Sequence, residues 1–296
     1  MRHRISQAKS LGLMVECDFL INNGSIMTKS EEWARAIRRE IIQASHDVGR
    51  LGVHIGSALS AADILAVLYS GVLKYDTSNP LSEGRDFFVL SKGHAYIGYY
   101  AVLAKAGFFS NEDIKAQFMT DGGWLPVHPV KNLEKGIEFS GGSLGTGMPF
   151  AVGKAYALKL KEQANKVCSL VGDGECDEGS IWEAFMSAAN LGLDNLTVVV
   201  DKNGMQQDGP TDEVLSVDIE AMAKACKWNV VVVDGHNHQE LINAFTQSFD
   251  NGKPKCIIAN TIKGKGVSFM ENDNSWHHAN MNEKQYNQAL EELSHD

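Results

Sequence analysis

The residues with the clearest chemical potential are one carboxylate and one carboxamide, each following an apolar, strand-like run. Asp173 lies in Gly172-Asp173-Gly174, and Asn203 follows the next apolar run along the chain. A right-handed β–α–β crossover of about 30 residues would bring both side chains to the same sheet edge. Their oxygens, with a main-chain carbonyl near Met205, would form half of an oxygen-only octahedron. Such a set suits Mg²⁺ or Ca²⁺, with a diphosphate group supplying further oxygens.

The backbone around Asp173 suits a phosphate group as well. Gly172 and Gly174 would let the main chain approach phosphate oxygens closely. A helix that begins near Glu178 would point the N–H groups of its first turn at the same place. A Gly-Asp-Gly turn by itself is common. The prediction therefore depends on the whole succession of strand, glycine turn, helix, strand and Asn203.

Imidazole is the second chemical resource of the chain. Four of the ten histidines lie in glycine-rich or proline-adjacent loops, namely His54, His94, His128 and His277. Near neutral pH an imidazole can both donate and accept a proton, so these four are candidates for acid–base chemistry. His46 and His236 are interpreted instead as surface or hydrogen-bonded structural residues.

The elements that must position these residues alternate between short apolar strands and helices. The runs rich in Val, Ile and Leu predict strands within 87–91, 166–174, 196–204, 229–236 and 255–266. Fully apolar strands separated by helices are typical of a parallel sheet covered on both faces. The fold class is therefore α/β, with a mostly parallel sheet flanked by helices. Ligands of such sheets bind at the carboxyl ends of the strands, where the candidate residues fall.

Helices are predicted at both ends of this core. Ser30 is the expected N-cap of a helix whose apolar residues recur every three or four positions. A second helix is expected over 60–73, a third over 178–193 and a surface helix near the C-terminus. No linker divides the chain, so residues 29–296 are predicted to form one domain. Residues 1–28 are predicted to be an N-terminal extension outside the fold, and a disordered segment is one interpretation of it.

Composition excludes several classes of function. The chain has 296 residues and a formal net charge of −10, which argues against nucleic-acid binding because such surfaces are basic. The five cysteines lack CxxC spacing, so reduced thiols in a cytoplasmic protein are expected. No apolar run has the length of a membrane span. Acidic residues interrupt the N-terminal segment, which argues against a signal peptide.

In order along the chain, these motifs resemble the transketolase family. The segment from Gly172 to Asn203 is similar to the family's thiamine diphosphate fingerprint, although Lys202 stands where the family usually has Asn or Asp. The likeness continues through the segments 52–69, 85–100, 125–130, 139–155 and 261–278. It implies a three-layer thiamine-diphosphate-binding fold, with Mg²⁺ or Ca²⁺ between the protein and the diphosphate.

The resemblance also implies roles for the histidines. His94 would contact the diphosphate, His54 and His128 would bind oxygens near C1 of the sugar, and His277 would lie near the thiazolium and the reacting carbonyl. His277-His278 replaces the family's His-Gly, so the choice between these two histidines stays open.

Three further cofactor contacts are implied. Gly142, Ser143 and Leu144 match a Gly-Pro-Leu loop whose backbone binds the aminopyrimidine, with Ser in place of Pro. Glu178 matches a glutamate of a carboxylate network between two cofactor sites; a helix N-terminal charge is the alternative interpretation. Lys263 stands where related enzymes place a cation against the diphosphate, and a solvated loop lysine is its alternative.

The resemblance further implies a two-chain enzyme. In full-length transketolases the glutamate that activates the aminopyrimidine lies in a later, pyrimidine-binding domain. We therefore expect a second subunit that carries that domain, together with a second copy of this chain. The implied reaction transfers a two-carbon ketol unit from a ketose or ketose phosphate to an aldose or aldose phosphate. The alternatives are a 2-oxo acid dehydrogenase component, a deoxyxylulose-phosphate synthase-like enzyme subunit or, from another class, a non-catalytic scaffold.

Overall fold

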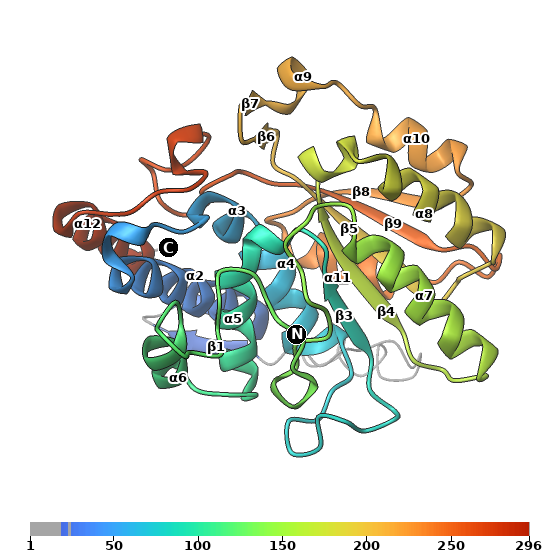
Figure 1. Cartoon of the computed structure of the whole chain (residues 1–296), viewed down its shortest axis with the longest axis horizontal. Helices are drawn as coiled ribbons and strands as arrows, with labels where there is room; N and C mark the ends of the chain where they lie inside the picture. The colour runs from blue at the N-terminus through green and yellow to red at the C-terminus, as the bar shows by residue number, and fades with distance from the viewer. Residues whose placement is uncertain (1–18, 23–24, 296) are drawn as a thin grey trace, which may run out of the picture.

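A sheet of five parallel strands forms the centre of the protein (Figure 1). The computed structural model describes residues 19–22 and 25–295. The strands stand in the order β3-β4-β5-β9-β8 and pair in parallel throughout. Their bounds are β3 Phe87–Leu90, β4 Val167–Gly172, β5 Leu196–Lys202, β9 Lys255–Asn260 and β8 Asn229–Asp234. All five predicted strands are confirmed.

Alternate side chains of each strand enter two separate apolar cores. Phe87 and Val89 of β3 face one core, and Phe88 and Leu90 face the other. This alternation follows from the period of two along a β-strand. The first core is closed by α7 (Gly147–Leu160), α8 (Gly179–Asn190) and α10 (Ile219–Ala225). The second is closed by α2 (Lys29–Asp47), α4 (Ala62–Val67), α5 (Tyr96–Ala106) and α11 (His238–Thr246). The predicted three-layer α/β fold is confirmed.

The start of α2 differs from the prediction. Thr28, not Ser30, is the N-cap, because its Oγ1 accepts the N–H of Glu31 at 3.3 Å. The Glu31 carboxylate in turn accepts the N–H of Thr28 at 2.6 Å, which completes a capping box. Ser30 is buried in the first turn, and its hydroxyl lies 2.8 Å from His238 of α11. The serine that was expected to be the N-cap therefore makes a contact between α2 and α11, and Thr28 is the N-cap in its place.

The helix expected over 60–73 is also placed differently. The segment forms α3 (Ile55–Ser60), then α4, and ends in a π-helical turn over Leu68–Val72. Every residue from 55 to 69 is buried. A helix buried on all sides has no polar face, so its boundaries leave no periodic signal in the sequence.

The remaining elements surround this core. They are β1 (Phe19–Asn22), β2 (Ser25–Thr28), α6 (Asn111–Gln117), β6 (Met205–Gln206), β7 (Gly209–Pro210), α9 (Thr211–Val214) and α12 (Glu283–His295).

The sequence predicts a feature at each end of the chain, a surface helix near the C-terminus and an extension at the N-terminus. The predicted surface helix, α12, buries Ala289 and Leu293 in the core that also contains α2. The extension predicted over 1–28 lies partly outside the described residues, and within it β1 and β2 pair antiparallel. None of the helices in the described part of the chain is both long and apolar enough to cross a membrane.

Candidate active site

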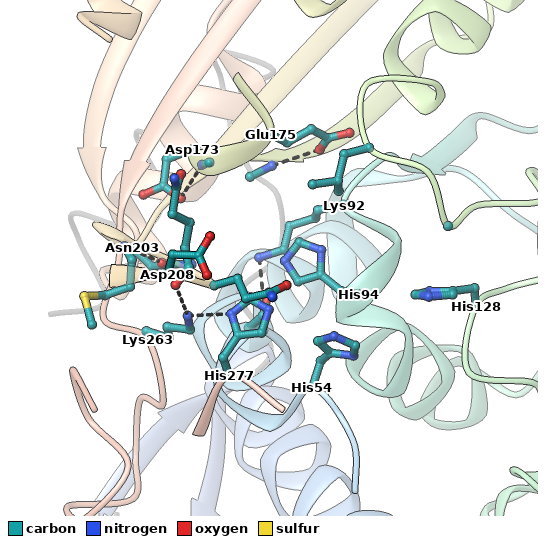
Figure 2. Close-up of a pocket in the computed structure, with 18 residues that line it drawn as sticks. His54, Lys92, His94, His128, Asp173, Glu175, Asn203, Asp208, Lys263 and His277 are labelled. Atoms are coloured by element: carbon teal, nitrogen blue, oxygen red, sulfur yellow. Dashed lines mark hydrogen bonds between the residues drawn. The ribbon is translucent and has the colours of Figure 1, made fainter. Parts of the chain in front are cut away.

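A cavity of about 360 Å³ opens at the carboxyl ends of the strands (Figure 2). It gathers side chains from loops that are far apart in the sequence. Twelve of the predicted site residues line it: His54, His94, His128, Gly142, Leu144, Gly172, Asp173, Gly174, Asn203, Met205, Lys263 and His277. Such a position is where parallel α/β sheets bind ligands, because the loops that follow the strands converge there.

Asp173 and Asn203 lie close together at the ends of β4 and β5. One oxygen of Asp173 accepts the N–H of Gly204 at 2.6 Å, and the other accepts the N–H of Gly174 at 2.9 Å. Asn203 Oδ1 accepts the N–H of Met205 at 3.1 Å. Burial, with the nearby charge of Asp201, raises the pKa of Asp173 to about 6. A cation bound here would offset the cost of burying that carboxylate.

The oxygen atoms of Asp173 and Asn203 suit a hard cation. The carboxylate and carboxamide oxygens are the ligand types that Mg²⁺ and Ca²⁺ take. Within residues 19–22 and 25–295, no three His, Cys, Asp or Glu side chains converge as ligands of a metal ion. A metal held by Asp173 and Asn203 would therefore need oxygens from the main chain or from a ligand.

Two buried lysines provide positive charge beside the cavity. Lys92 is fully buried, pairs with Asp201 and donates to the Ser57 carbonyl at 3.2 Å. The Lys263 ammonium donates to Asn274 Oδ1 and to His277 Nδ1, both at 2.9 Å. Burial, followed by repulsion from Lys92, lowers the pKa of Lys263 to about 8. Lys263 is almost fully buried, so the alternative of a solvated loop lysine is wrong for this structure. Its contact with a diphosphate stays a prediction.

The four predicted histidines form one cluster around His54. The ring centre of His54 lies 5.8 Å from that of His94, 6.2 Å from that of His128 and 5.3 Å from that of His277. Burial, followed by the neighbouring imidazole of His277, lowers the pKa of His54 to about 3. Burial and Lys263 lower the pKa of His277 to about 4, and burial and Lys92 hold the pKa of His94 well below its usual value. These three imidazoles are neutral at pH 7, so each has one donor and one acceptor nitrogen.

Several polar atoms of the cavity wall have no hydrogen-bond partner in the described part of the protein. They are Nδ1 of His54, Nδ1 of His128, Oγ of Ser57 and Oε1 of Gln206. Buried polar groups in native proteins are normally paired. Bound water or a polar ligand with hydroxyl groups would supply the partners that these atoms need.

The structure distinguishes His277 from His278. His277 lines the cavity, whereas His278 is exposed and packs edge-on against His54 with ring centres 4.7 Å apart. Because Lys263 donates to Nδ1 of His277, the proton of the neutral ring must be on Nε2. His277 can therefore act as a hydrogen-bond donor through Nε2.

Two predicted cofactor contacts lie outside the cavity lining of this chain. Ser143 is exposed, and its carbonyl accepts the hydroxyl of Thr146 at 2.7 Å. Glu178 is exposed at the N-cap position of α8. Their contacts with a cofactor stay predictions.

Six cavity residues were missed by sequence reasoning: Ser57, Lys92, Glu175, Gln206, Gln207 and Asp208. Glu175 is almost fully buried and accepts three hydrogen bonds from the protein. Its carboxylate accepts the hydroxyl of Ser91 at 2.6 Å and the N–H groups of Gly145 at 2.9 Å and Gly172 at 3.1 Å. Burial raises the pKa of Glu175 despite these bonds. Its place directly after the Gly-Asp-Gly turn, and that of Lys92 two residues before His94, were signals that could have identified both.

Gly174 has a packing role in addition to the predicted contact with a phosphate group, which stays a prediction. A Cβ at this position would lie 2.7 Å from Oε1 of Gln206, so a side chain would clash with the β6–β7 hairpin. The close approach observed here is therefore to a neighbouring side chain of the same protein.

Known proteins resemble this chain in sequence over almost its whole length. The family model described as "Transketolase, thiamine diphosphate binding domain" matches residues 30–296. A protein of Actinobacillus succinogenes named as a subunit of apulose-4-phosphate transketolase is 39% identical over 264 residues, which cover 89% of this chain and 95% of that protein. The 6-deoxy-6-sulfo-D-fructose transketolase subunit SqwG of Clostridium sp. (strain MSTE9) is 40% identical over 263 residues, covering 88% and 94%.

Solved structures agree with the sequence comparisons. The transketolase of Campylobacter jejuni matches with a TM-score of 0.81 at 29% identity, over 90% of this chain. The matched part is 42% of the Campylobacter chain. The protein thus spans nearly all of the two relatives that are named as subunits and less than half of that transketolase.

Proposed function

Because the chain belongs to the transketolase family and carries its thiamine-diphosphate-binding domain, we propose that it is one subunit of a two-chain transketolase. The complete enzyme would transfer a two-carbon ketol unit from a ketose to an aldose. Two of its relatives are named for ketoses that bear a phosphate or a sulfo group. A donor with an anionic tail is therefore the first class of substrate to test.

One observation carries this proposal: the cavity combines the Asp173–Asn203 pair with four clustered histidines. The first feature suits the metal–diphosphate end of a cofactor, and the second suits a substrate rich in hydroxyl groups. A non-catalytic scaffold would have no need for buried imidazole nitrogens without partners, such as those of His54 and His128.

Asp173, Asn203 and the carbonyl of Met205 would hold Mg²⁺ or Ca²⁺, and Lys92 and Lys263 would supply further positive charge near the diphosphate. When bound, thiamine diphosphate supplies a nucleophilic carbon and accepts the electron pair released when the carbon–carbon bond breaks. The chain itself would bind, orient and exchange protons around that chemistry.

The histidines are suited to binding the hydroxyl and carbonyl oxygens of the substrate around that chemistry. With their pKa values lowered by burial, His54, His94 and His277 stay neutral at physiological pH. A neutral imidazole can accept a hydrogen bond from a hydroxyl through one nitrogen and donate a hydrogen bond to an alkoxide through the other. His277 would donate from Nε2 to the oxygen of the reacting carbonyl, because Lys263 occupies its Nδ1.

The need for a partner is supported by what the cavity lacks and by what the surface exposes. Among the described residues that line the cavity, the carboxylates of Asp173 and Glu175 accept backbone N–H groups and that of Asp208 is exposed to solvent, so none is a buried carboxylate without partners that could face an aminopyrimidine.

The neighbouring helices α7 and α8 expose the large apolar side chains of Phe150, Tyr156, Leu160 and Met186. Contacts with a second subunit or a second copy would bury such side chains.

The test is reconstitution. The chain should be purified alone and together with the product of the adjacent gene, and ketol transfer should be measured with thiamine diphosphate and Mg²⁺. We expect no turnover of any ketose by the chain alone, because an unactivated aminopyrimidine and a half-open site do not support the chemistry.

A panel of ketoses with and without a phosphate or sulfonate tail would identify the donor. Turnover that appears only on mixing supports the proposal. Robust activity of the single chain would overturn the two-chain proposal.

A further inference from the structure

A second polar cluster surrounds the buried carboxylate of Asp63 in α4. The Asp63 carboxylate accepts hydrogen bonds from both terminal nitrogens of Arg38, from His236 Nδ1 at 2.6 Å and from His238 Nε2 at 3.0 Å. Burial alone would raise the pKa of Asp63, but the charge of Arg38 and the imidazole hydrogen bonds hold it well below its usual value. None of these four residues lines the cavity. We call them the Asp63 cluster.

Two members of the cluster reach the loop that follows β9. His236 Nε2 accepts the N–H of Ile262 at 2.9 Å, and Arg38 Nε donates to the carbonyl of Lys265 at 3.2 Å. These two backbone groups lie on either side of Lys263. The loop over residues 261–266 is therefore attached at both ends to the same carboxylate, through two different side chains.

The backbone is shaped for this attachment. A Cβ on Gly235 would lie 2.4 Å from Thr261 Cγ2, so only glycine lets the end of β8 approach the end of β9 this closely. That approach brings the next residue, His236, within reach of Ile262. The ring nitrogen that accepts from Ile262 is unprotonated, which places the proton of a neutral His236 on Nδ1, facing Asp63.

The attached loop carries a residue of the cavity. Lys263 is almost fully buried, and its ammonium donates to Asn274 Oδ1 and to His277 Nδ1. A shift of the loop would move a cation of the cavity and would also remove the donor that fixes the proton of His277 on Nε2. Site geometry is sensitive to displacements of this size, since an error of about 1 Å can cost roughly a hundredfold in rate.

We propose that Asp63 and His236 are positioning residues, which hold the loop over residues 261–266 so that Lys263 and His277 keep their places in the cavity. The consequence for ketol transfer depends on the proposed function. The attachment of the loop does not, because it is a property of this chain alone.

His238 provides a matched control. It donates to the same carboxylate from Nε2, is buried to a similar extent as His236, and its Nδ1 faces the Ser30 hydroxyl at 2.8 Å. Its two ring nitrogens thus bond to Asp63 and Ser30, and neither bonds to the loop. Replacing either histidine by Phe removes one hydrogen bond to Asp63 and keeps the bulk of the ring, but only His236→Phe releases Ile262.

The first measurement is amide hydrogen exchange in the full chain. The informative amides are those of Gly264, bonded to the Gly56 carbonyl, and Asn272, bonded to the Lys263 carbonyl. Neither touches His236, so their exchange reports movement of the loop. We expect about tenfold faster exchange at both amides in His236→Phe, the effect of losing one buried hydrogen bond, and less than about twofold in His238→Phe. Equal exchange in the two variants would overturn the proposal.

A second variant guards against misfolding of the first. Arg38→Lys keeps a cation beside Asp63 but removes the Nε–H that holds the Lys265 carbonyl. It should also speed exchange at Gly264. Unchanged exchange there in a folded Arg38→Lys protein would contradict an attachment at this end of the loop.

The third measurement uses the assembled two-chain enzyme. In His236→Phe we expect about tenfold weaker binding of thiamine diphosphate with Mg²⁺ and a similar loss of kcat, whereas His238→Phe should match the wild type. A loss of thermal stability with no change in either constant would reduce His236 to a structural role. If the wild-type pair shows no ketol transfer, the proposed function fails, and the exchange measurements still decide whether the cluster holds the loop.

Discussion

Histidines in two regions of this protein have opposite surroundings. In the cavity, Nδ1 of His54 and Nδ1 of His128 are buried without a partner in the described structure, and Nδ1 of His277 accepts from the ammonium of Lys263 at 2.9 Å. On the side of α2 and α11, three histidines each meet a carboxylate. His46 pairs with Glu283 at 3.1 Å, and His236 and His238 bind Asp63 at 2.6 and 3.0 Å.

The difference shows how one residue type serves two purposes. A histidine whose nitrogens bind protein groups stabilises packing and holds backbone in place. A histidine with an unpaired buried nitrogen costs stability in the free protein, and a ligand can offset that cost by pairing with it. Sequence neighbourhood alone distinguishes the two groups only partly, because His236 also follows a glycine.

The largest expected effect would come from Asp173→Ala at the cavity. If Asp173 holds the cation that anchors the diphosphate, its loss should abolish cofactor binding and leave the fold intact, at a cost of several kcal/mol in binding. Calorimetric titration of the assembled enzyme with thiamine diphosphate and Mg²⁺ measures this. Asp194→Ala, which removes an exposed carboxylate paired with Lys159, is the control. Affinity like that of the wild type in Asp173→Ala would refute the metal assignment.

Alanine substitution tests directly whether the cavity histidines and the carboxylate-paired histidines differ in function. We expect His94→Ala, His128→Ala and His277→Ala to reduce ketol transfer by roughly ten- to ten-thousand-fold, the range for lost acid–base or positioning groups. His46→Ala removes a ring that stacks on Tyr286 at 4.1 Å and should leave turnover within about twofold. Steady-state kinetics of the assembled enzyme is the measurement. A loss in His46→Ala as large as in the others would show that the two groups are wrongly divided.

The smallest effect concerns a carboxylate on the α2 side. Burial, followed by repulsion from Asp47 and Glu112, raises the pKa of Glu40 to about 7. The folded state thus binds a proton more tightly than the unfolded state, so the stabilisation is complete below the ordinary pKa of 4.5 and is lost as pH rises through 7. Glu40→Gln mimics the protonated form and should raise Tm by about 1–2 °C at pH 8, after allowance for partial exposure, and by less at pH 5.

Scanning calorimetry at the two pH values tests this, with the exposed Glu213→Gln as control. A larger gain for Glu40→Gln at pH 5 than at pH 8 would contradict the sign. Cofactor affinity should not change, because the groove around Glu40 is separate from the cavity.

The sequence predicted the sheet better than the helices around it. Fully apolar runs such as 87–90 identify buried strands, since both faces of a parallel sheet are covered. The order of the strands could not be read from such runs, because β9 pairs with both β5 and β8 through contacts that leave no local pattern. The helices over residues 55–67 were misplaced for a related reason, as their complete burial removes the polar face that marks a helix boundary.

The site was predictable where a residue type and a turn coincide. Asp173 and Asn203 follow strands, His94 follows a glycine, and His128 precedes a proline. Lys92 and Glu175 were missed because a lysine or glutamate in a loop is usually solvated. Here both side chains are buried: Lys92 is paired with Asp201, and Glu175 accepts backbone N–H groups. The Asp63 cluster was missed because its members come from three separate segments of the chain.

The strand order also bears on how the protein is made. β3 has no partner strand until β4 has been synthesised, and α5, α6 and α7 lie between them in the chain. β8 has no neighbour in the sheet until β9 has left the ribosome. Pairings between distant segments fold slowly, because a long loop must close before any contact compensates for its lost entropy. During that interval the apolar edges of β5 and β8 are open to other nascent chains. Synthesis of this protein is therefore a stage at which chaperones would have to protect unpaired strands.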